Sequence, residues 1–400
     1  MIKNLNLDKI YQLLLIILAF LLPLTVFGAN LIIVIICVLW LFSGNYKSKF
    51  DQIISSKLML ASILFFCLHL AGLLWTDDLE WGLHIVHKMW YFIGLFPILF
   101  TLVQKDYIKY YISAYLIAIS ISEMISYLIW FELIQPFKYA TVEDPTALMS
   151  HISYNPLLAI AIYIVYHEIF LNKKLDRVKF FIYSFFAITM TINMFITGGR
   201  AGQVMYFAML VILIFQFFNS DKIKSLLAIM ILIPGIFFAA YHSSDLFQTR
   251  VDNAIENVKD YELNKNSSVG KRISYAKNSW DIILKNPLIG VGTGDFPIEF
   301  QKAAILNDNY YGTITSNPLN MYNLILVQLG LLGFISFLSI FYYQIKQSFL
   351  SPSGFMRDFG ITLPLLFLVI MFSESYLLGH YTSLLYVFFS SFTYNDFKEY

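Results

Sequence analysis

The chain has 400 residues, of which 58% are hydrophobic and 13% are charged, and its mean hydropathy is +0.67. Soluble globular domains carry about 25% charged residues, so this composition excludes a soluble domain and predicts an integral membrane protein. The formal net charge is +1. A chain so close to neutral lacks the basic stripe that neutralises the phosphates of a duplex, which excludes nucleic acid as a partner.

Twelve apolar runs follow one another along the chain, and most are near the ~20 residues that cross a bilayer as a helix. They cover residues 11–27, 30–43, 57–75, 84–103, 107–134, 150–171, 179–197, 200–219, 224–241, 318–345, 357–374 and 376–393. Their length excludes an outer-membrane barrel, whose strands alternate over ~10 residues. The predicted fold is therefore all-α, with about twelve transmembrane helices. The short second run leaves open a half-buried hairpin with the first.

Basic residues predict the orientation of these helices. With a cytoplasmic N-terminus, the cytoplasmic segments hold sixteen of the 27 Lys and Arg residues, and the short external loops hold three. The remaining eight lie in residues 242–317, a segment too long to count in the positive-inside rule. Both termini are thus predicted in the cytoplasm of a bacterium, and residues 242–317 in the periplasm.

The predicted organisation has three parts. Residues 1–241 form helices one to nine, residues 242–317 form a partly helical periplasmic loop, and residues 318–400 form helices ten to twelve and a short tail. The first run lacks a convincing small-residue cleavage site and is interpreted as a retained helix. Because short turns would suffice for connection, the long polar loop is where recognition or chemistry is expected.

Arg200 opens the run 200–219, directly after Gly198 and Gly199. An arginine at that depth costs about 2.5–3.5 kcal/mol if it faces lipid. Two adjacent glycines permit a tight turn that aims the positive N-terminus of the next helix in the same direction as the guanidinium. The pattern predicts an anion site; the alternative interpretation is an anchor that fixes the helix end.

Lys271 and Arg272 lie at the start of a predicted amphipathic helix over residues 272–285, which Pro287 ends. Its apolar stripe is expected to consist of Ile273, Ala276, Trp280 and Ile283. A flexible turn should follow at Gly290, Gly292 and Gly294, without the Gly-Lys-Ser/Thr ending of a nucleotide loop.

Asn317, Asn320 and Asn323 are spaced three apart at the start of the run 318–345. This spacing predicts one helical face at the membrane surface, where amides can bind sugar hydroxyls or a pyrophosphate. Further along the run, Gly330 and Gly333 predict close helix packing.

Together these motifs resemble the O-antigen ligase and polymerase superfamily. The resemblance rests on Thr-Gly-x-Arg at the start of a late span, on Arg-x7-Trp-x6-Pro-Leu-Ile-Gly-Val-Gly-x-Gly, and on Pro-x-Asn-Met-Tyr leading into Gly-Leu-Leu-Gly. Residues 74–97 are also similar to the family's early segment, so the likeness covers most of the chain.

The resemblance implies a GT-C-like, polytopic glycosyltransferase of the bacterial inner membrane. Members take a glycan from undecaprenyl diphosphate at the periplasmic face. Ligases transfer it to the lipid A core, polymerases to another repeat unit, and related oligosaccharyltransferases to a protein hydroxyl. A ligase is the expected subtype here, inverting, without a cofactor, and in contact with membrane lipids. The rival class is a lipid-glycan transporter, which usually shows pseudo-repeated halves and paired intramembrane charges that this chain lacks.

The resemblance also implies that Arg200 and Arg272 hold the donor diphosphate. This agrees with their charge, since guanidinium groups can stabilise a leaving pyrophosphate without a metal. Asn320 matches the asparagine of the family's His-Asn signature, but Leu319 stands where the histidine is expected. Leucine can neither relay a proton nor bind phosphate. Either the acceptor is activated otherwise, or the chain is inactive, or the register of the match differs.

His151 and His380 are the best substitutes for the missing histidine, although each can also be an ordinary helix-end group. Glu123 and Glu374 are expected to pair with such groups. No Asp-x-Asp or His-rich set predicts a metal, and Cys37 and Cys67 are expected to pack inside spans. The candidate catalytic residues are Arg200, Arg272, Asn320 and His151, and the candidate substrate-binding residues are Lys271, Arg250, Asn317, Tyr322, Asn323 and His380.

Overall fold

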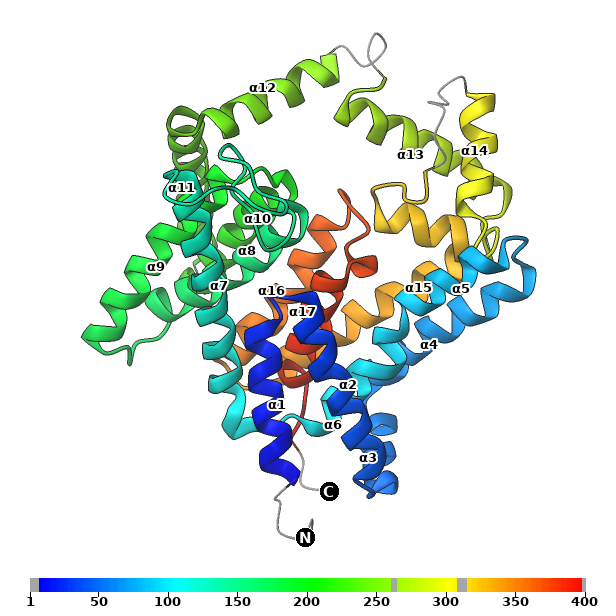
Figure 1. Cartoon of the computed structure of the whole chain (residues 1–400), viewed down its shortest axis with the longest axis horizontal. Helices are drawn as coiled ribbons and strands as arrows, with labels where there is room; N and C mark the ends of the chain where they lie inside the picture. The colour runs from blue at the N-terminus through cyan, green and yellow to red at the C-terminus, as the bar shows by residue number, and fades with distance from the viewer. Residues whose placement is uncertain (1–6, 220, 260–264, 308–314, 398–400) are drawn as a thin grey trace. The chain divides into compact units, whose positions relative to one another are not determined.

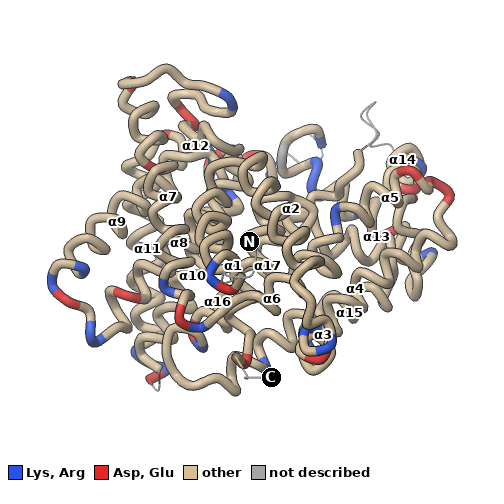
Figure 2. The backbone as a smooth tube through the Cα atoms, turned by 60° about the horizontal axis from the view of Figure 1, so that its bottom comes forward, with Lys and Arg blue, Asp and Glu red and all other residues tan. Residues whose placement is uncertain are grey.

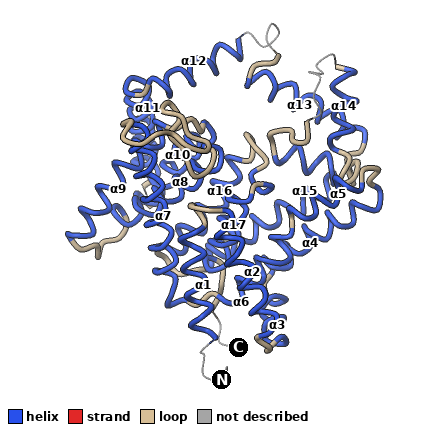
Figure 3. The backbone as a smooth tube through the Cα atoms, viewed as in Figure 1, coloured by secondary structure: helices blue, strands red, loops and turns tan. Residues whose placement is uncertain are grey.

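The protein is all-helical in the part of the chain that its computed structural model describes. These residues are 7–219, 221–259, 265–307 and 315–397, and within them the backbone forms helices and connecting segments but no strand (Figure 3). The predicted all-α class is therefore confirmed. Residues 260–264 and 308–314 of the predicted loop lie outside the described ranges.

Every predicted apolar run coincides with a helix. The helices are α1 (Leu7–Leu21), α2 (Val26–Phe42), α4 (Lys57–Ala71), α5 (Leu79–Lys88), α6 (Phe96–Leu102), α7 (Ile108–Trp130), α8 (His151–Phe170), α9 (Arg177–Ile196), α10 (Arg200–Phe218), α11 (Lys222–Ser243), α15 (Met321–Leu350), α16 (Phe355–Ile370) and α17 (His380–Thr393). A short α3 (Tyr46–Ser55) follows α2, and the segment between α11 and α15 contains α12 (Asp245–Lys259), α13 (Ser268–Lys285) and α14 (Phe296–Leu306).

Seven helical segments of the described chain are long and apolar enough to cross a membrane, or eight if α2 and α3 form one bent span. They are Lys57–Trp75, Leu79–Leu102, Lys105–Trp130, Arg177–Ile196, Arg200–Phe218, Lys222–Ser243 and Met321–Leu350. Most of the other predicted spans are short helices: α1 has 15 residues, α2 17, α16 16 and α17 14. At 1.5 Å per residue, a helix of about 15 residues falls short of the ~30 Å hydrocarbon core.

Charged residues are mostly confined to the helix ends and the connecting segments. Figure 2 shows the helix bodies largely free of Lys, Arg, Asp and Glu. Charges are costly in hydrocarbon and favourable at its surface, so this distribution is that of a multi-pass membrane protein.

The chain forms two compact units. The first consists of Met1–Phe42, Leu102–Asp252 and Ser351–Ile370, and the second of Ser43–Thr101, Asn253–Leu350 and Met371–Tyr400. In the first unit, α8 is the central helix and contacts α7, α9, α10 and α16 (Figure 1). In the second unit, α15 packs against α4 and α13.

Polar side chains connect α8 to its neighbours inside the first unit. The Tyr154 hydroxyl donates to Asn193 Oδ1 at 2.9 Å, and Asn193 Nδ2 donates to Ser126 Oγ at 2.9 Å. Farther along α8, the Tyr163 hydroxyl donates to Gln216 Oε1 at 2.8 Å. Hydrogen bonds between apolar helices fix the rotation of each helix about its axis, so α8 holds a defined register against α9 and α10.

In the second unit, α15 is broken at Gly330, where φ is 60° and ψ is −156°. The backbone groups released by the break bond to residues 287–292: Val291 N–H donates to Val327 at 2.8 Å, and Leu331 N–H donates to Pro287 at 2.8 Å. A Cβ on Gly330 would lie 2.4 Å from the carbonyl carbon of Leu288. The glycine turn is thus held by α15 rather than flexible. At Gly330 a loop approaches α15 closely, whereas the sequence predicted close packing with another helix.

The predicted amphipathic helix is present as α13, which ends just before Pro287, but its predicted apolar stripe is only partly right. Ile283 is buried, whereas Trp280 is 56% exposed and Ala276 is also exposed. The other buried side chains are Ser274, Asn278, Ser279 and Ile282. Contact with α14 and α15 selects a more polar face of the helix than hydrophobicity alone indicates.

Candidate functional site

Residues 197–200 form a tight turn between α9 and α10 that requires its glycines. A Cβ on Gly199 would lie 2.8 Å from the carbonyl oxygen of His151, and a Cβ on Gly202 would lie 2.1 Å from the Cβ of Asn155. The Asn155 amide bonds this turn directly, because its Nδ2 donates to the Gly199 carbonyl at 3.3 Å and its Oδ1 accepts from Thr197 Oγ1 at 2.9 Å. The glycines therefore let α10 begin in backbone contact with α8.

Because residues 151 and 155 of α8 meet residues 199 and 202 beside α10, the two helices run in the same direction. Their N-termini lie side by side, and each carries a partial charge of about +0.5. Arg200 is the first residue of α10 and His151 the first residue of α8. Arg200, which is predicted to bind an anion, thus lies where the N-termini of α8 and α10 meet.

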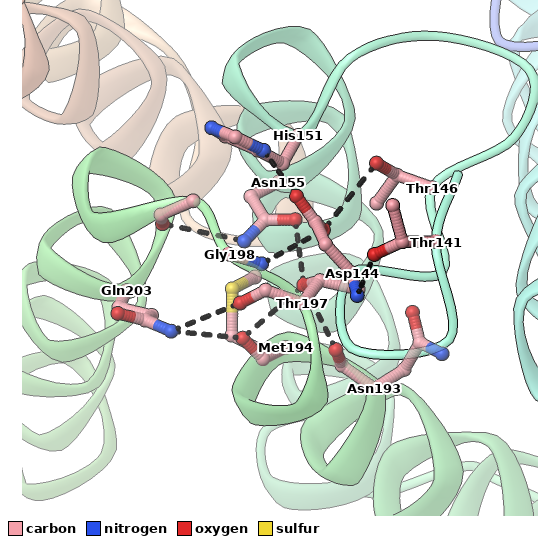
Figure 4. A network of polar contacts seen from close by, with 11 residues as sticks. Thr141, Asp144, Thr146, His151, Asn155, Asn193, Met194, Thr197, Gly198 and Gln203 are labelled. Atoms are coloured by element: carbon pink, nitrogen blue, oxygen red, sulfur yellow. Dashed lines mark hydrogen bonds and ion pairs between the residues drawn. The ribbon is translucent and has the colours of Figure 1, made fainter. Parts of the chain in front are cut away.

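Asp144 joins the loop before α8 to this point (Figure 4). One carboxylate oxygen lies 2.5 Å from His151 Nδ1, and the other accepts from the Gly198 N–H at 3.0 Å. The loop is braced around Asp144, whose carbonyl accepts from the N–H groups of Thr141 at 3.1 Å and Thr146 at 2.8 Å. We call Asp144, His151, Arg200 and Arg250, together with the 197–200 turn, the Arg200 cluster.

Arg250 of α12 reaches the same place. One of its guanidinium nitrogens lies 3.3 Å from the position that a Cβ on Gly198 would occupy. Burial alone would raise the pKa of Asp144, but the hydrogen bonds from His151 and Gly198 and the charges of His151 and Arg250 lower it below its ordinary value of 3.8. The carboxylate is therefore ionised at neutral pH. Within the first unit, three of the predicted site residues lie together.

Lys271 and Arg272 lie in the second unit, in the early turns of α13. The Ser267 side chain caps this helix by accepting from the Gly270 N–H at 3.0 Å. Arg272 lies near the Tyr376 side chain. Both basic residues are half-buried.

The three asparagines do not form one helical face, because α15 begins only at Met321. Asn317 lies before the helix, where Pro318 disfavours helical backbone, and its Nδ2 lies 2.5 Å from Glu374 Oε1. Asn320 precedes the first turn and accepts from the Asn323 N–H at 3.1 Å, while its Nδ2 donates to the Phe372 carbonyl at 3.2 Å. The oxygen and the nitrogen of the Asn320 side-chain amide thus both hold the start of α15.

Leu319 has a left-handed backbone, with φ at +54°. This region is uncommon for bulky residues, whereas Asn, Asp and His are enriched in it. The Leu319 N–H donates to Asn317 Oδ1 at 2.9 Å. Next to it, the Tyr322 ring packs against Phe372 with centroids 4.5 Å apart.

The expected pairing of Glu123 and Glu374 with histidines is wrong. His151 pairs with Asp144, and His380 Nδ1 lies 2.6 Å from the Tyr91 hydroxyl. Glu374 bonds Asn317 and the Ser375 N–H instead. Glu123 is buried, and among the described residues no histidine bonds its carboxylate. The acidic partner of a histidine came from the neighbouring loop rather than from within a span.

Two acids of the loop segment, Asp295 and Glu299, have structural partners. Asp295 is 5% exposed, and its carboxylate accepts from the N–H groups of Asp77 at 2.9 Å and Asp78 at 2.8 Å. Glu299 forms an ion pair with Lys302 at 2.5 Å. Across the described ranges, no three His, Cys, Asp or Glu side chains are placed to hold a metal ion.

Sequence reasoning missed Asp144. A usable signal was present, since an acidic residue seven positions before His151 lies in the loop that leads into α8. A carboxylate and an imidazole confined to the surface of a membrane are expected to pair. Its contact with Gly198 depends on the fold and has no counterpart in the local sequence.

Residues 185–338 match the family model described as O-Antigen ligase. No curated protein matches the chain. The matched region runs from α9 into α15 and includes the 197–200 turn, Arg250 and Arg272. Members of this family are membrane enzymes of the glycosyltransferase type. The match at residues 185–338 supports the resemblance to the O-antigen ligase and polymerase superfamily that the motifs indicated.

Proposed function

We propose that the protein is an O-antigen ligase that transfers a glycan from undecaprenyl diphosphate to the lipid A core oligosaccharide. The observation that carries this proposal is the Arg200 cluster. Arg250 and Arg200, the first residue of α10, lie there together with the N-termini of two parallel helices. Such an arrangement suits a diphosphate, because backbone N–H groups and guanidinium groups both bind phosphate oxygens.

The cluster would act on the leaving group. As the bond between the anomeric carbon and the phosphate oxygen breaks, negative charge develops on undecaprenyl diphosphate. Arg200 and Arg250 offer fixed positive charge to that oxygen without a metal ion, and preorganised charge of this kind is worth several kcal/mol. The acceptor hydroxyl attacks from the face opposite the diphosphate, so the anomeric configuration inverts.

The topology proposed for this reaction has about twelve membrane helices, both termini in the cytoplasm and residues 242–317 in the periplasm of a bacterial inner membrane. The distribution of Lys and Arg along the sequence supports it. On this topology, the loop carrying Asp144 and the start of α10 face the periplasm, where a lipid-linked glycan is presented. A membrane-impermeant thiol reagent should label a cysteine introduced at Asn266 in intact spheroplasts, and not one introduced at Asn172.

The remaining candidate residues lie in the second unit, and substrate binding by each of them stays a proposal. The resemblance implies that Arg272 holds the donor diphosphate, and Lys271 beside it is proposed to bind substrate. Asn317, Tyr322, Asn323 and His380 would contact the glycan or the acceptor, although Asn317 and His380 already have protein partners that a substrate would have to share. Asn320 would act through the start of α15 that it holds.

Surface glycan of a strain lacking the gene tests the reaction. Core oligosaccharide without polymer, restored by the wild-type chain and not by Arg200→Ala, supports a ligase. A single repeat unit on the core would identify a polymerase, and loss of glycan from proteins alone would identify a protein oligosaccharyltransferase. Accumulation of donor on the cytoplasmic side would identify a transporter and overturn the proposed chemistry.

A further inference from the structure

The pair formed by Asp144 and His151 has the geometry of a positioned base. The carboxylate of Asp144 lies 2.5 Å from His151 Nδ1, and the two side chains are 19% and 31% exposed. The second oxygen of Asp144 is fixed by the Gly198 N–H at 3.0 Å. Neither side chain is buried away from solvent, and neither is free to rotate without losing a bond.

The carboxylate determines which ring nitrogen of His151 can accept a proton. An ionised carboxylate only accepts hydrogen bonds, so Nδ1 must carry the hydrogen, and in the neutral ring the lone pair lies on Nε2. Figure 4 shows the far nitrogen of His151 pointing away from Asp144 and from the other residues drawn. Nε2 is thus the ring nitrogen left to meet a substrate.

We propose that His151 Nε2 is the general base that takes the proton of the acceptor hydroxyl, with Asp144 as its positioning residue. This inference rests on the proposed glycosyl transfer. It also accounts for Leu319, because a base on α8 makes a histidine at that position unnecessary. The charged group that reaches the pair is Arg250 from α12, and Arg200 is the first residue of the neighbouring helix α10.

The step is balanced by groups already named. The acceptor O–H bond breaks and its proton moves to His151 Nε2. The hydroxyl oxygen forms the new bond to the anomeric carbon, and the electron pair of the old glycosidic bond leaves with undecaprenyl diphosphate. Asp144 stabilises the imidazolium that results, and His151 then releases the proton to water.

The structural alternative is that Asp144 only braces its loop against Gly198. Asp144→Asn separates the two roles. The asparagine Oδ1 can still accept from the Gly198 N–H, but its Nδ2 donates to His151 Nδ1 and forces the hydrogen onto Nε2. Transfer should then fall by about 10²–10⁴-fold, the usual contribution of a positioned base, with folding and donor binding retained.

His151→Ala should lower the rate to a similar extent, and the double variant should be no slower than His151→Ala alone, because Asp144 acts through His151. A matched control is Asp358→Asn, which makes the same change in a second Asp–His pair: Asp358 Oδ2 lies 3.0 Å from His167 Nε2 at the other end of α8. The transfer rate of Asp358→Asn, divided by the amount of folded protein, should stay within about twofold of wild type.

Binding of undecaprenyl diphosphate is measured on every variant alongside transfer. Slow transfer with normal binding in Asp144→Asn and His151→Ala supports the inference. Wild-type rates in both variants, with Arg200→Ala inactive, would overturn the base and leave the ligase proposal standing. Additive losses in the double variant would assign Asp144 a purely structural role. Unchanged transfer in all of them, Arg200→Ala included, would overturn the proposed function itself.

Discussion

The contact between Gly202 and Asn155 makes one substitution diagnostic for the geometry of the site. In Gly202→Ala, the new Cβ would lie 2.1 Å from the Asn155 Cβ and 2.9 Å from its carbonyl carbon. Carbon atoms approach one another to about 3.5–4.0 Å, so α8 and α10 must separate by about 1.5 Å. Because the obstacle is backbone, a rotamer change cannot relieve it. Overpacking of this kind costs about 1–3 kcal/mol in the free energy of unfolding.

The same separation moves Arg200 away from His151, since each is the first residue of its helix. A misplacement of about 1 Å can cost about 10²-fold in rate. The control is Gly235→Ala in α11, where no atom lies within 4 Å of the new Cβ and the change should stabilise the helix by about 0.5–1 kcal/mol. Thermal unfolding in detergent and transfer by the purified protein measure both effects. If Gly202→Ala unfolds at the same temperature as Gly235→Ala and transfers glycan at the wild-type rate, α8 and α10 do not meet as described.

Four further predictions follow from the site. Arg200→Ala should abolish transfer by correctly inserted protein, and Arg200→Lys should restore little of it because the bidentate fork is lost; near-normal transfer by Arg200→Ala would exclude the diphosphate role. Purified enzyme should keep its activity in EDTA, and a loss that Mg²⁺ restores would make acids metal ligands instead. Leu319→His should fold at least as stably as wild type, since its backbone is left-handed, and should change the rate by less than about threefold; a rise of 10²-fold would place the base there and not on α8. Because the pKa of Asp144 is lowered in the folded protein, its stabilising effect is present above its ordinary value and is lost as the pH falls below it, so the stability gap between wild type and Asp144→Asn should close on acidification from pH 6 to pH 3.

Much of the fold could be predicted from the sequence, because apolar runs and glycines report directly on local structure. Each run became a helix, and the turn before Arg200 is where its two glycines placed it. The number of spans was harder to predict, since a run of apolar letters does not reveal that α17 is helical for only 14 residues. The length of an apolar run in the sequence includes turns and helix caps that do not cross a membrane.

The predictions of which side chains are buried and where helices begin failed because tertiary contacts decide both. Hydrophobicity placed Trp280 on the buried face of α13, whereas packing buries Asn278 and leaves Trp280 exposed. Spacing placed Asn317 on a helix that Pro318 prevents from starting there. The bond between Asp144 and Gly198 could not be predicted, because it joins residues 54 positions apart and leaves no signal in the local sequence. The pairing of Asp144 with His151, seven positions apart, had a local signal and was missed.

The most direct test of the account is the affinity of the purified protein for undecaprenyl diphosphate, measured in nanodiscs for wild type, Arg200→Ala, Arg250→Ala and the control Gly235→Ala. Hydrogen bonds to charged groups contribute about 1.5–3 kcal/mol, so each arginine variant should bind about 10- to 150-fold more weakly, with the control unchanged. Wild-type affinity in both arginine variants, at wild-type stability, would contradict the claim that the Arg200 cluster binds the donor diphosphate.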